Sequence, residues 1–130
     1  MIEREMDLNE INGQIIDAAM KVHSALGPDK SEYAYEACLE HELKKRGLRV
    51  RRQVPLPIIY DGERIDAGLR INLLIENEIV VELKAVGKIR RRHEGQLVSY
   101  LKTTSRKIGL LIIFETPHLK NGVRRLLNGP

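Results

Sequence analysis

Apolar residues recur at helical spacing in two stretches near the start of the chain. Between Leu8 and Leu26 they fall mostly three and four residues apart, which predicts an amphipathic helix that ends at Gly27-Pro28. The next four residues, Asp29 to Glu32, have the spacing of a capping box, with an acceptor at the N-cap and a glutamate three positions later. They predict a second helix that runs to Arg46 and stops at Gly47.

The period changes to that of β-strands after this helix. From Leu48 to Tyr60 apolar residues alternate with polar or basic ones, and Pro55 and Pro57 favour a place at the edge of a sheet. Asp61-Gly62 is a turn signal that leads into the next strands.

A short antiparallel hairpin is predicted between Arg70 and Ala85. The apolar runs Ile71–Ile75 and Ile79–Val81 flank Glu76-Asn77-Glu78, so the turn is centred on Asn77. In that register Asn72 lies opposite Glu82, and Lys84 points to the same face as Glu82 because side chains alternate along a strand.

The last third of the chain continues the alternation of elements. A basic loop, residues 86–92, precedes a helix over His93–Leu101, on which Gln96 and Tyr100 share a face. Lys107–Phe114 is almost continuously aliphatic, as in a central strand buried on both faces, and Val123–Leu127 is a short terminal strand. The order α-α-β-β-β-α-β-β indicates an α/β protein with a mixed sheet flanked by helices.

Length and composition limit what the chain can be. Its 130 residues with 42% hydrophobic content suit a single domain over residues 1–130. The one cysteine, Cys38, excludes an internal disulfide and fits a reducing compartment. Residues 1–7 lack the apolar core of a secretion signal, and no run reaches the roughly 20 apolar residues of a membrane span. We therefore expect a soluble, cytoplasmic protein that does not bind a membrane.

Positive charge is clustered along the chain. The net charge is +4 and the pI about 9.3, and the basic residues gather in short runs, which suits a polyanion better than a small neutral substrate. The candidates for contact with nucleic acid are Lys88, Arg90, Arg91, Arg92, Arg51 and Arg52.

Three polar side chains converge on one face of the predicted hairpin. Asn72, Glu82 and Lys84 stand among Ile, Val and Leu, where a carboxylate and an ammonium each need a partner, water or a metal. One interpretation is a cross-strand salt bridge on a solvated sheet face. The other is an E-x-K site for a metal ion and water.

These motifs resemble those of a known family. A glutamate on a helix, a hairpin with a polar residue opposite E-x-K and a helix with Q-x-x-x-Y resemble the PD-(D/E)XK nuclease superfamily. The segments R-Q-V-P-L-P (residues 52–57), V-E-L-K-A (residues 81–85) and H-E-G-Q-L (residues 93–97) are similar to the small GxxExxY proteins, over about Ile11 to Asn128. The resemblance implies a restriction endonuclease-like fold.

The resemblance also implies roles for individual residues. Position 72, Glu82 and the backbone carbonyl of Leu83 would hold Mg²⁺ or Mn²⁺, with Glu32 or Glu36 beside them. Lys84 would orient or help to deprotonate the attacking water. Gln96 and Tyr100 would contact the site or the phosphate; the alternative for both is packing of the helix on the sheet.

The chain departs from the family pattern at two positions. Asp29 stands where the naming motif has glycine, and Asn72 stands where the family has the metal-binding aspartate. An asparagine offers a carbonyl oxygen without charge, so metal affinity should be weakened. Asp66 cannot replace it, because six extended residues separate the two by roughly 20 Å.

The sequence therefore predicts a metal-dependent nuclease that hydrolyses phosphodiester bonds, with DNA a better candidate than RNA, impaired by Asn72. The first alternative is an inactive domain that still binds nucleic acid. The second is a protein-interaction subunit, as a homodimer or in a larger complex. We also expect Asn72, Glu82 and Lys84 to share one cleft with Gln96 and with Glu32 or Glu36.

Overall fold

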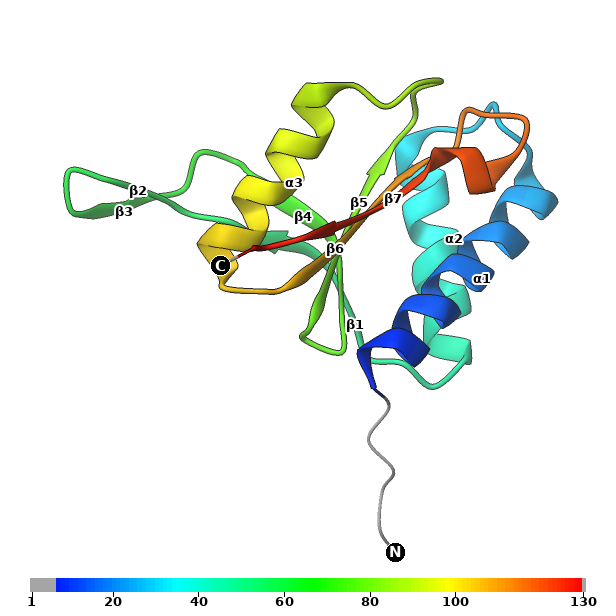
Figure 1. Ribbon diagram of the computed structural model, residues 1–130, viewed down its shortest axis with the longest axis horizontal. Coiled ribbons are helices and arrows are strands. Elements are labelled where there is room, and N and C mark those ends of the chain that lie inside the picture. Colours follow the sequence, from blue (N-terminus) through cyan, green and yellow to red (C-terminus); the bar gives the residue numbers. More distant parts are fainter. Residues whose placement is uncertain (1–6, 130) are drawn as a thin grey trace, which may run out of the picture.

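The computed structural model describes residues 7–129. A five-stranded sheet lies between α1 and α2 on one side and α3 on the other (Figure 1). The order of its strands is β1-β4-β5-β6-β7, and the elements are α1 (Leu8–Leu26), α2 (Glu32–Lys45), β1 (Val50–Pro55), β2 (Ile58–Tyr60), β3 (Glu63–Ile65), β4 (Arg70–Ile75), β5 (Ile79–Lys84), α3 (Arg91–Thr104), β6 (Ile108–Ile113), the 3-10 helix η1 (Leu119–Gly122) and β7 (Val123–Leu127). Without β2, β3 and η1, this is the order that the sequence predicts.

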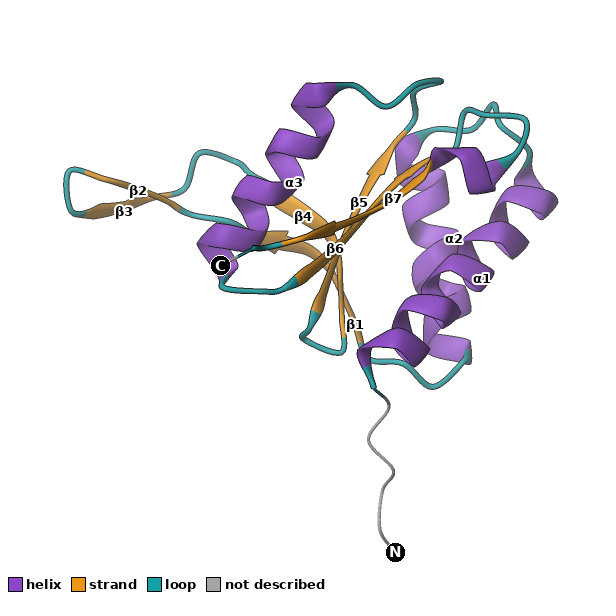
Figure 2. Ribbon diagram, in the orientation of Figure 1, coloured by secondary structure: helices purple, strands orange, loops and turns teal. Residues whose placement is uncertain are grey.

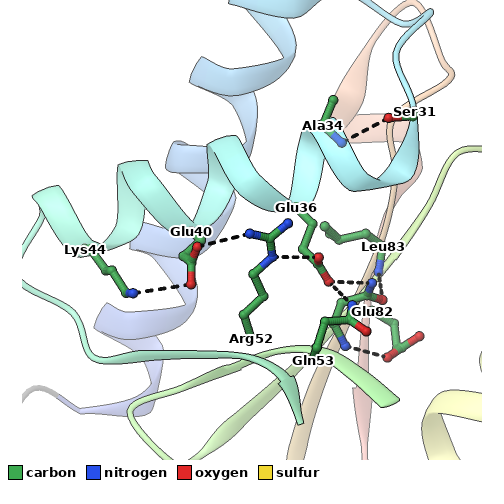
Figure 3. Close-up of polar contacts among 10 residues, drawn as sticks. Ser31, Ala34, Glu36, Glu40, Lys44, Arg52, Gln53, Glu82 and Leu83 are labelled. Atoms are coloured by element: carbon green, nitrogen blue, oxygen red, sulfur yellow. Dashed lines mark hydrogen bonds and ion pairs between the residues drawn. The ribbon is translucent and has the colours of Figure 1, made fainter. Parts of the chain in front are cut away.

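The first two helices are confirmed, with one correction. α1 has the predicted bounds, and Gly27 ends it with φ 74°, a conformation that glycine adopts readily. α2 is capped by Ser31, not by Asp29 as predicted, because the Ser31 hydroxyl accepts a hydrogen bond from the Ala34 N–H at 3.1 Å (Figure 3). Ser31 directly precedes the first helical residue, which is where an N-cap side chain reaches the free N–H groups.

The hairpin of β4 and β5 has the predicted register. Leu73 pairs with Val81 and Ile75 with Ile79, which centres the turn on Asn77. Glu76 and Asn77 have φ angles of 52° and 56°, as tight hairpin turns require. β5 continues the sheet by pairing in parallel with β6.

The segment Leu48–Tyr60 is not one strand. β1 lies at the edge of the main sheet, as its prolines predict, but within residues 7–129 β2 pairs with β3 and with no strand of the main sheet. This second hairpin turns at Asp61-Gly62 and projects away from the main sheet (Figures 1 and 2). Its side chains Ile58, Ile59, Tyr60 and Ile65 are exposed.

The third helix begins earlier and ends later than predicted. α3 starts at Arg91, so Arg91 and Arg92 form its first turn and are not part of a loop. β6 is buried along its whole length, in agreement with its aliphatic sequence. η1 between β6 and β7 was not predicted.

Separate apolar clusters cover the two faces of the sheet. On the side of α1 and α2, Leu73, Val81 and Leu83 pack with helical residues, and Tyr35 stacks on Phe114 with ring centroids 4.2 Å apart. On the other side, Val80 and Leu111 pack against Leu97, Tyr100 and Leu101 of α3. By alternation, Glu82 and Lys84 point to the side of α3.

No helix within residues 7–129 is both long and apolar enough to cross a membrane. The prediction that the chain lacks a secretion signal concerns residues 1–7, and residues 1–6 lie outside the part that the structure describes.

Candidate functional site

A cluster of polar side chains, called the polar group below, lies where the regular pairing of β4 and β5 ends. Beyond the Leu73–Val81 pair, side chains take the place of backbone partners. The Asn72 N–H donates to Glu82 Oε1 at 3.3 Å, and the Leu83 N–H donates to Asn72 Oδ1 at 3.0 Å. Asn72 and Glu82 therefore hold this end of the hairpin together with their side chains.

Glu36 brings α2 into the same group. Its carboxylate is 2% exposed and accepts from side chains of two strands (Figure 3). Oε2 accepts from Arg52 Nε at 2.8 Å, and Oε1 accepts from Gln53 Nε2 at 2.5 Å and from Asn72 Nδ2 at 3.0 Å. A buried carboxylate needs such donors, and here the guanidinium also neutralises its charge.

The partners of Asn72 fix the orientation of its amide. Oδ1 meets the Leu83 N–H, and Nδ2 meets the Glu36 carboxylate. With the amide turned over, two donors would face each other at Leu83 and two acceptors at Glu36. Both ends of the Asn72 side chain are thus committed to protein partners.

Gln53 belongs to the site although no sequence signal points to it. It lies between the paired residues Arg52 and Val54 of β1, opposite Asn72, and its φ is 54°. Positive φ is uncommon outside glycine and is found where surroundings impose it. The hydrogen bond to Glu36 accompanies this backbone conformation, and neither is visible in an alternating strand pattern.

Glu82 is buried beside a single positive charge. Burial raises the pKa of Glu82 from 4.5 to about 7, against the lowering effect of Lys84 and of the Asn72 N–H; the nearby Glu32 and Glu36 raise it further. Lys84 Nζ lies 3.8 Å from Glu82 Oε2. The carboxyl is therefore divided between its neutral and charged forms near neutral pH.

Gln96 and Tyr100 contact each other on α3. Gln96 Nε2 donates to the Tyr100 hydroxyl at 2.8 Å, as their spacing of four residues allows. Burial, together with the charge of Glu82, raises the pKa of Tyr100. Tyr100 also packs in the apolar cluster under α3. Its ring therefore belongs to the core, while its hydroxyl belongs to the polar group.

A cavity of about 600 Å³ opens beside this group, between α2, α3 and the strands β1 and β4. It brings together four predicted residues from two helices, Glu32, Glu36, Gln96 and Tyr100, with Asn72 of the sheet. Glu82 and Lys84 do not line it, so the expectation of one shared cleft is wrong for them. The lining residues that the sequence did not indicate are Tyr33, Gln53, Gly68, Leu69 and Arg70.

The predicted nucleic-acid contacts divide into two kinds. Lys88, Arg90, Arg91, Arg92 and Arg51 are exposed, and within residues 7–129 their side chains have no ion pair. Arg52 is different, because it is bound to Glu36 and lines the cavity. Its contact with nucleic acid stays a prediction, for an arginine that a protein carboxylate already holds.

His93 fastens the start of α3. It is buried, and its Nδ1 accepts a hydrogen bond from the Arg90 N–H at 3.0 Å. Burial lowers the pKa of His93, helped by the charges of Arg92, Lys84 and Arg90. The ring is therefore neutral. Its hydrogen bond to Arg90 holds the start of α3, around which the three arginines lie.

The donor set does not fit a divalent metal in this arrangement. Mg²⁺ and Mn²⁺ need oxygen ligands arranged around one point. Asn72 Oδ1 is occupied by the Leu83 N–H, and both oxygens of Glu36 accept from side chains. Within residues 7–129 no three His, Cys, Asp or Glu side chains are grouped so as to hold a metal ion. Asn72 Nδ2 is a donor that points at Glu36, so this end of the amide offers a cation no ligand.

Comparison with known proteins identifies one related family. The sequence model of the PD-(D/E)XK nuclease superfamily matches residues 9–126. Neither a curated protein nor a solved structure gave a match. The mixed sheet between helices and the order of its elements confirm the predicted restriction endonuclease-like fold.

Proposed function

Because the chain belongs to the PD-(D/E)XK nuclease superfamily, we propose that it is a nuclease-like domain that binds nucleic acid and in which Asn72 suppresses hydrolysis. The observation that carries the proposal is the position of the Asn72 amide. It joins Glu36 to Leu83 and uses the oxygens that a metal ion would need. Binding remains possible because it depends on other side chains.

The exposed basic residues supply the attraction for phosphates. Arg90, Arg91 and Arg92 stand at the start of α3, where the helix dipole is also positive. This is an unfavourable place for three cations unless an anion is bound, and nucleic-acid backbones provide such anions. Lys88 lies two residues before this run and adds to the same positive charge, whereas Arg51 lies nearer the β4–β5 turn. We take DNA as the first ligand to test.

The proposal is tested by measuring DNA binding with and without divalent ions. Fluorescence anisotropy with a labelled oligonucleotide in EDTA should give the same affinity as in Mg²⁺, because no step of binding uses a metal. Incubation of the same DNA in Mg²⁺ or Mn²⁺ should leave it intact on a denaturing gel. Binding that requires the divalent ion would contradict the proposal.

A second candidate function is metal-dependent hydrolysis by the same site. It is favoured by the pairing of Glu82 with Lys84, which is the E-x-K arrangement of V-E-L-K-A in residues 81–85. The same motifs support our inference that the chain is of the GxxExxY type. Cleavage of DNA that needs Mg²⁺ or Mn²⁺ and is lost in Lys84→Ala would place this candidate first.

A further inference from the structure

Tyr33 is an exposed aromatic residue at the rim of the cavity. It lies in the first turn of α2, is 71% exposed and lines the cavity with Glu36, Arg52 and Gln96. Single exposed aromatic side chains are common, and what distinguishes Tyr33 from the similarly exposed Tyr60 is its place on the lining of the cavity. The Tyr33 ring is therefore available to a ligand that enters the cavity.

Arg52 covers one face of this ring and holds it in place. Its guanidinium carbon lies 4.6 Å from the centre of the Tyr33 ring, an ordinary cation–π distance. The guanidinium is itself fixed by Glu36 at 2.8 Å and by Glu40 at 3.5 Å. An aromatic ring that is already ordered loses little entropy when a ligand binds to it.

The rest of the rim offers hydrogen bonds to the edge of a flat ligand. The side chain of Glu32, one residue before Tyr33, has neither a hydrogen bond nor an ion pair with any residue of the described range 7–129. A free carboxylate can accept from an exocyclic amino group of a base, which a phosphate cannot offer. Gln96 lines the cavity from α3 and adds an amide.

We propose that this cavity takes an unpaired nucleobase, stacked on Tyr33, so that the domain prefers single-stranded nucleic acid over a duplex. The inference rests on the proposed function and adds the form of its ligand. Both faces of a base within a duplex are covered by neighbouring bases, so entry would first require unstacking. An unpaired base can stack on the ring directly, and the exposed arginines then hold the adjoining phosphates.

The test compares the affinities of a single-stranded oligonucleotide and of a hairpin duplex by fluorescence anisotropy in EDTA. The parent should bind the single strand more tightly than the duplex. Tyr33→Ala should lose about 5- to 150-fold of the affinity for the single strand, the range for removal of one base–aromatic stack, and little for the duplex. Tyr33→Phe keeps the ring and should keep the affinity.

Tyr60→Ala is the matched control. Tyr60 is 69% exposed on the β2–β3 hairpin and does not line the cavity, so its replacement should leave single-strand binding unchanged. Equal loss in the two alanine variants, or none in Tyr33→Ala, would overturn the inference while nucleic-acid binding itself stood. Failure of the parent to bind either form of DNA would overturn the proposed function and this inference together.

Discussion

At the scale of single residues, the pairing of Asn72 with Glu82 could be predicted, but the partners of Asn72 could not. The register followed from apolar runs around Asn77, which are local in sequence. The hydrogen bonds that Glu36 accepts from Asn72 and Gln53 depend on how α2 sits over β1 and on the left-handed backbone of Gln53 in a strand. Neither leaves a periodic trace in the sequence.

Glu82→Gln tests the burial of that carboxyl through the dependence of stability on pH. The folded protein keeps the Glu82 proton up to about pH 7, whereas the unfolded chain releases it near 4.5. The folded state thus binds more protons in this window, and stability falls as pH rises through it. Relative to Glu82→Gln, which never ionises, the parent should lose up to about 3 kcal/mol of unfolding free energy between pH 4.5 and 8.

Urea unfolding of both proteins at several pH values measures this difference. The glutamine keeps an oxygen for the Asn72 N–H, so its geometry is a fair match for the neutral carboxyl. A difference in stability that stays constant from pH 4.5 to 8 would show that Glu82 titrates in the folded protein as it does when unfolded.

At the scale of elements, the sequence indicated each strand of the main sheet but merged β1 with β2. Pro55 and Pro57 correctly predicted an edge, yet the same prolines also end β1 and release the chain into the β2–β3 hairpin. In the part of the chain that the structure describes, that hairpin pairs with no other strand and its apolar side chains are exposed, so the alternation of a half-buried strand does not mark it. The basic run at residues 90–92 similarly hid the start of α3.

Gly109→Ala tests the contact between α3 and β6. A Cβ at this position would lie 2.8 Å from Leu97 Cδ1, so the helix or the leucine would have to move. We expect a loss of roughly 1–3 kcal/mol in the free energy of unfolding. Denaturant unfolding followed by circular dichroism gives the value.

Gly13→Ala is the control for that variant. Gly13 lies within α1, where an added Cβ would have no atom of residues 7–129 within 4 Å apart from its chain neighbours and its own helix backbone. Alanine should therefore stabilise the protein by about 0.5–1 kcal/mol through its helix propensity. Destabilisation by both substitutions to a similar extent would contradict the view that close packing at Gly109 is the cause.

At the scale of the whole molecule, composition predicted a polyanion as partner without showing where it binds. Many basic residues are paired within the protein, among them Arg46 with Glu42 and Asp17, and Arg49 with Glu76. The exposed arginines at the start of α3, Arg90, Arg91 and Arg92, have no ion pair with any residue of the described range 7–129. The unpaired positive charge is therefore concentrated near one end of that helix. Only the folded structure separates the two kinds of arginine.

Replacing Arg90, Arg91 and Arg92 together with alanine tests this group. Affinity for DNA should fall, and the slope of log affinity against log salt should become shallower by about 0.9 for each duplex phosphate contact that is lost. Anisotropy titrations over a series of salt concentrations measure both quantities.

Alanine at Lys102, Lys107 and Lys120 removes the same number of exposed positive charges from other places and serves as the control. Its salt slope should stay close to that of the parent. The same change of slope in both triple variants would show that net charge, and not the start of α3, governs binding.

The Asn72 amide is central to the site, because it closes the site to metal ions. Asn72→Asp has nearly the same shape but replaces the Nδ2 donor with an oxygen, and it places a third carboxylate beside those of Glu36 and Glu82. Without metal this repulsion should lower the stability of the variant. With Mn²⁺ or Mg²⁺ the new carboxylate supplies the charged ligand that the asparagine lacks, so the thermal unfolding temperature should recover.

Isothermal titration calorimetry of Mn²⁺ into the parent and into Asn72→Asp is the most direct measurement. Asn72→Asp should bind Mn²⁺ at least tenfold more tightly than the parent does, a difference of about 1.4 kcal/mol in binding free energy. Equal affinity of the two proteins for the ion, whether tight or undetectable, would contradict this role of the Asn72 amide.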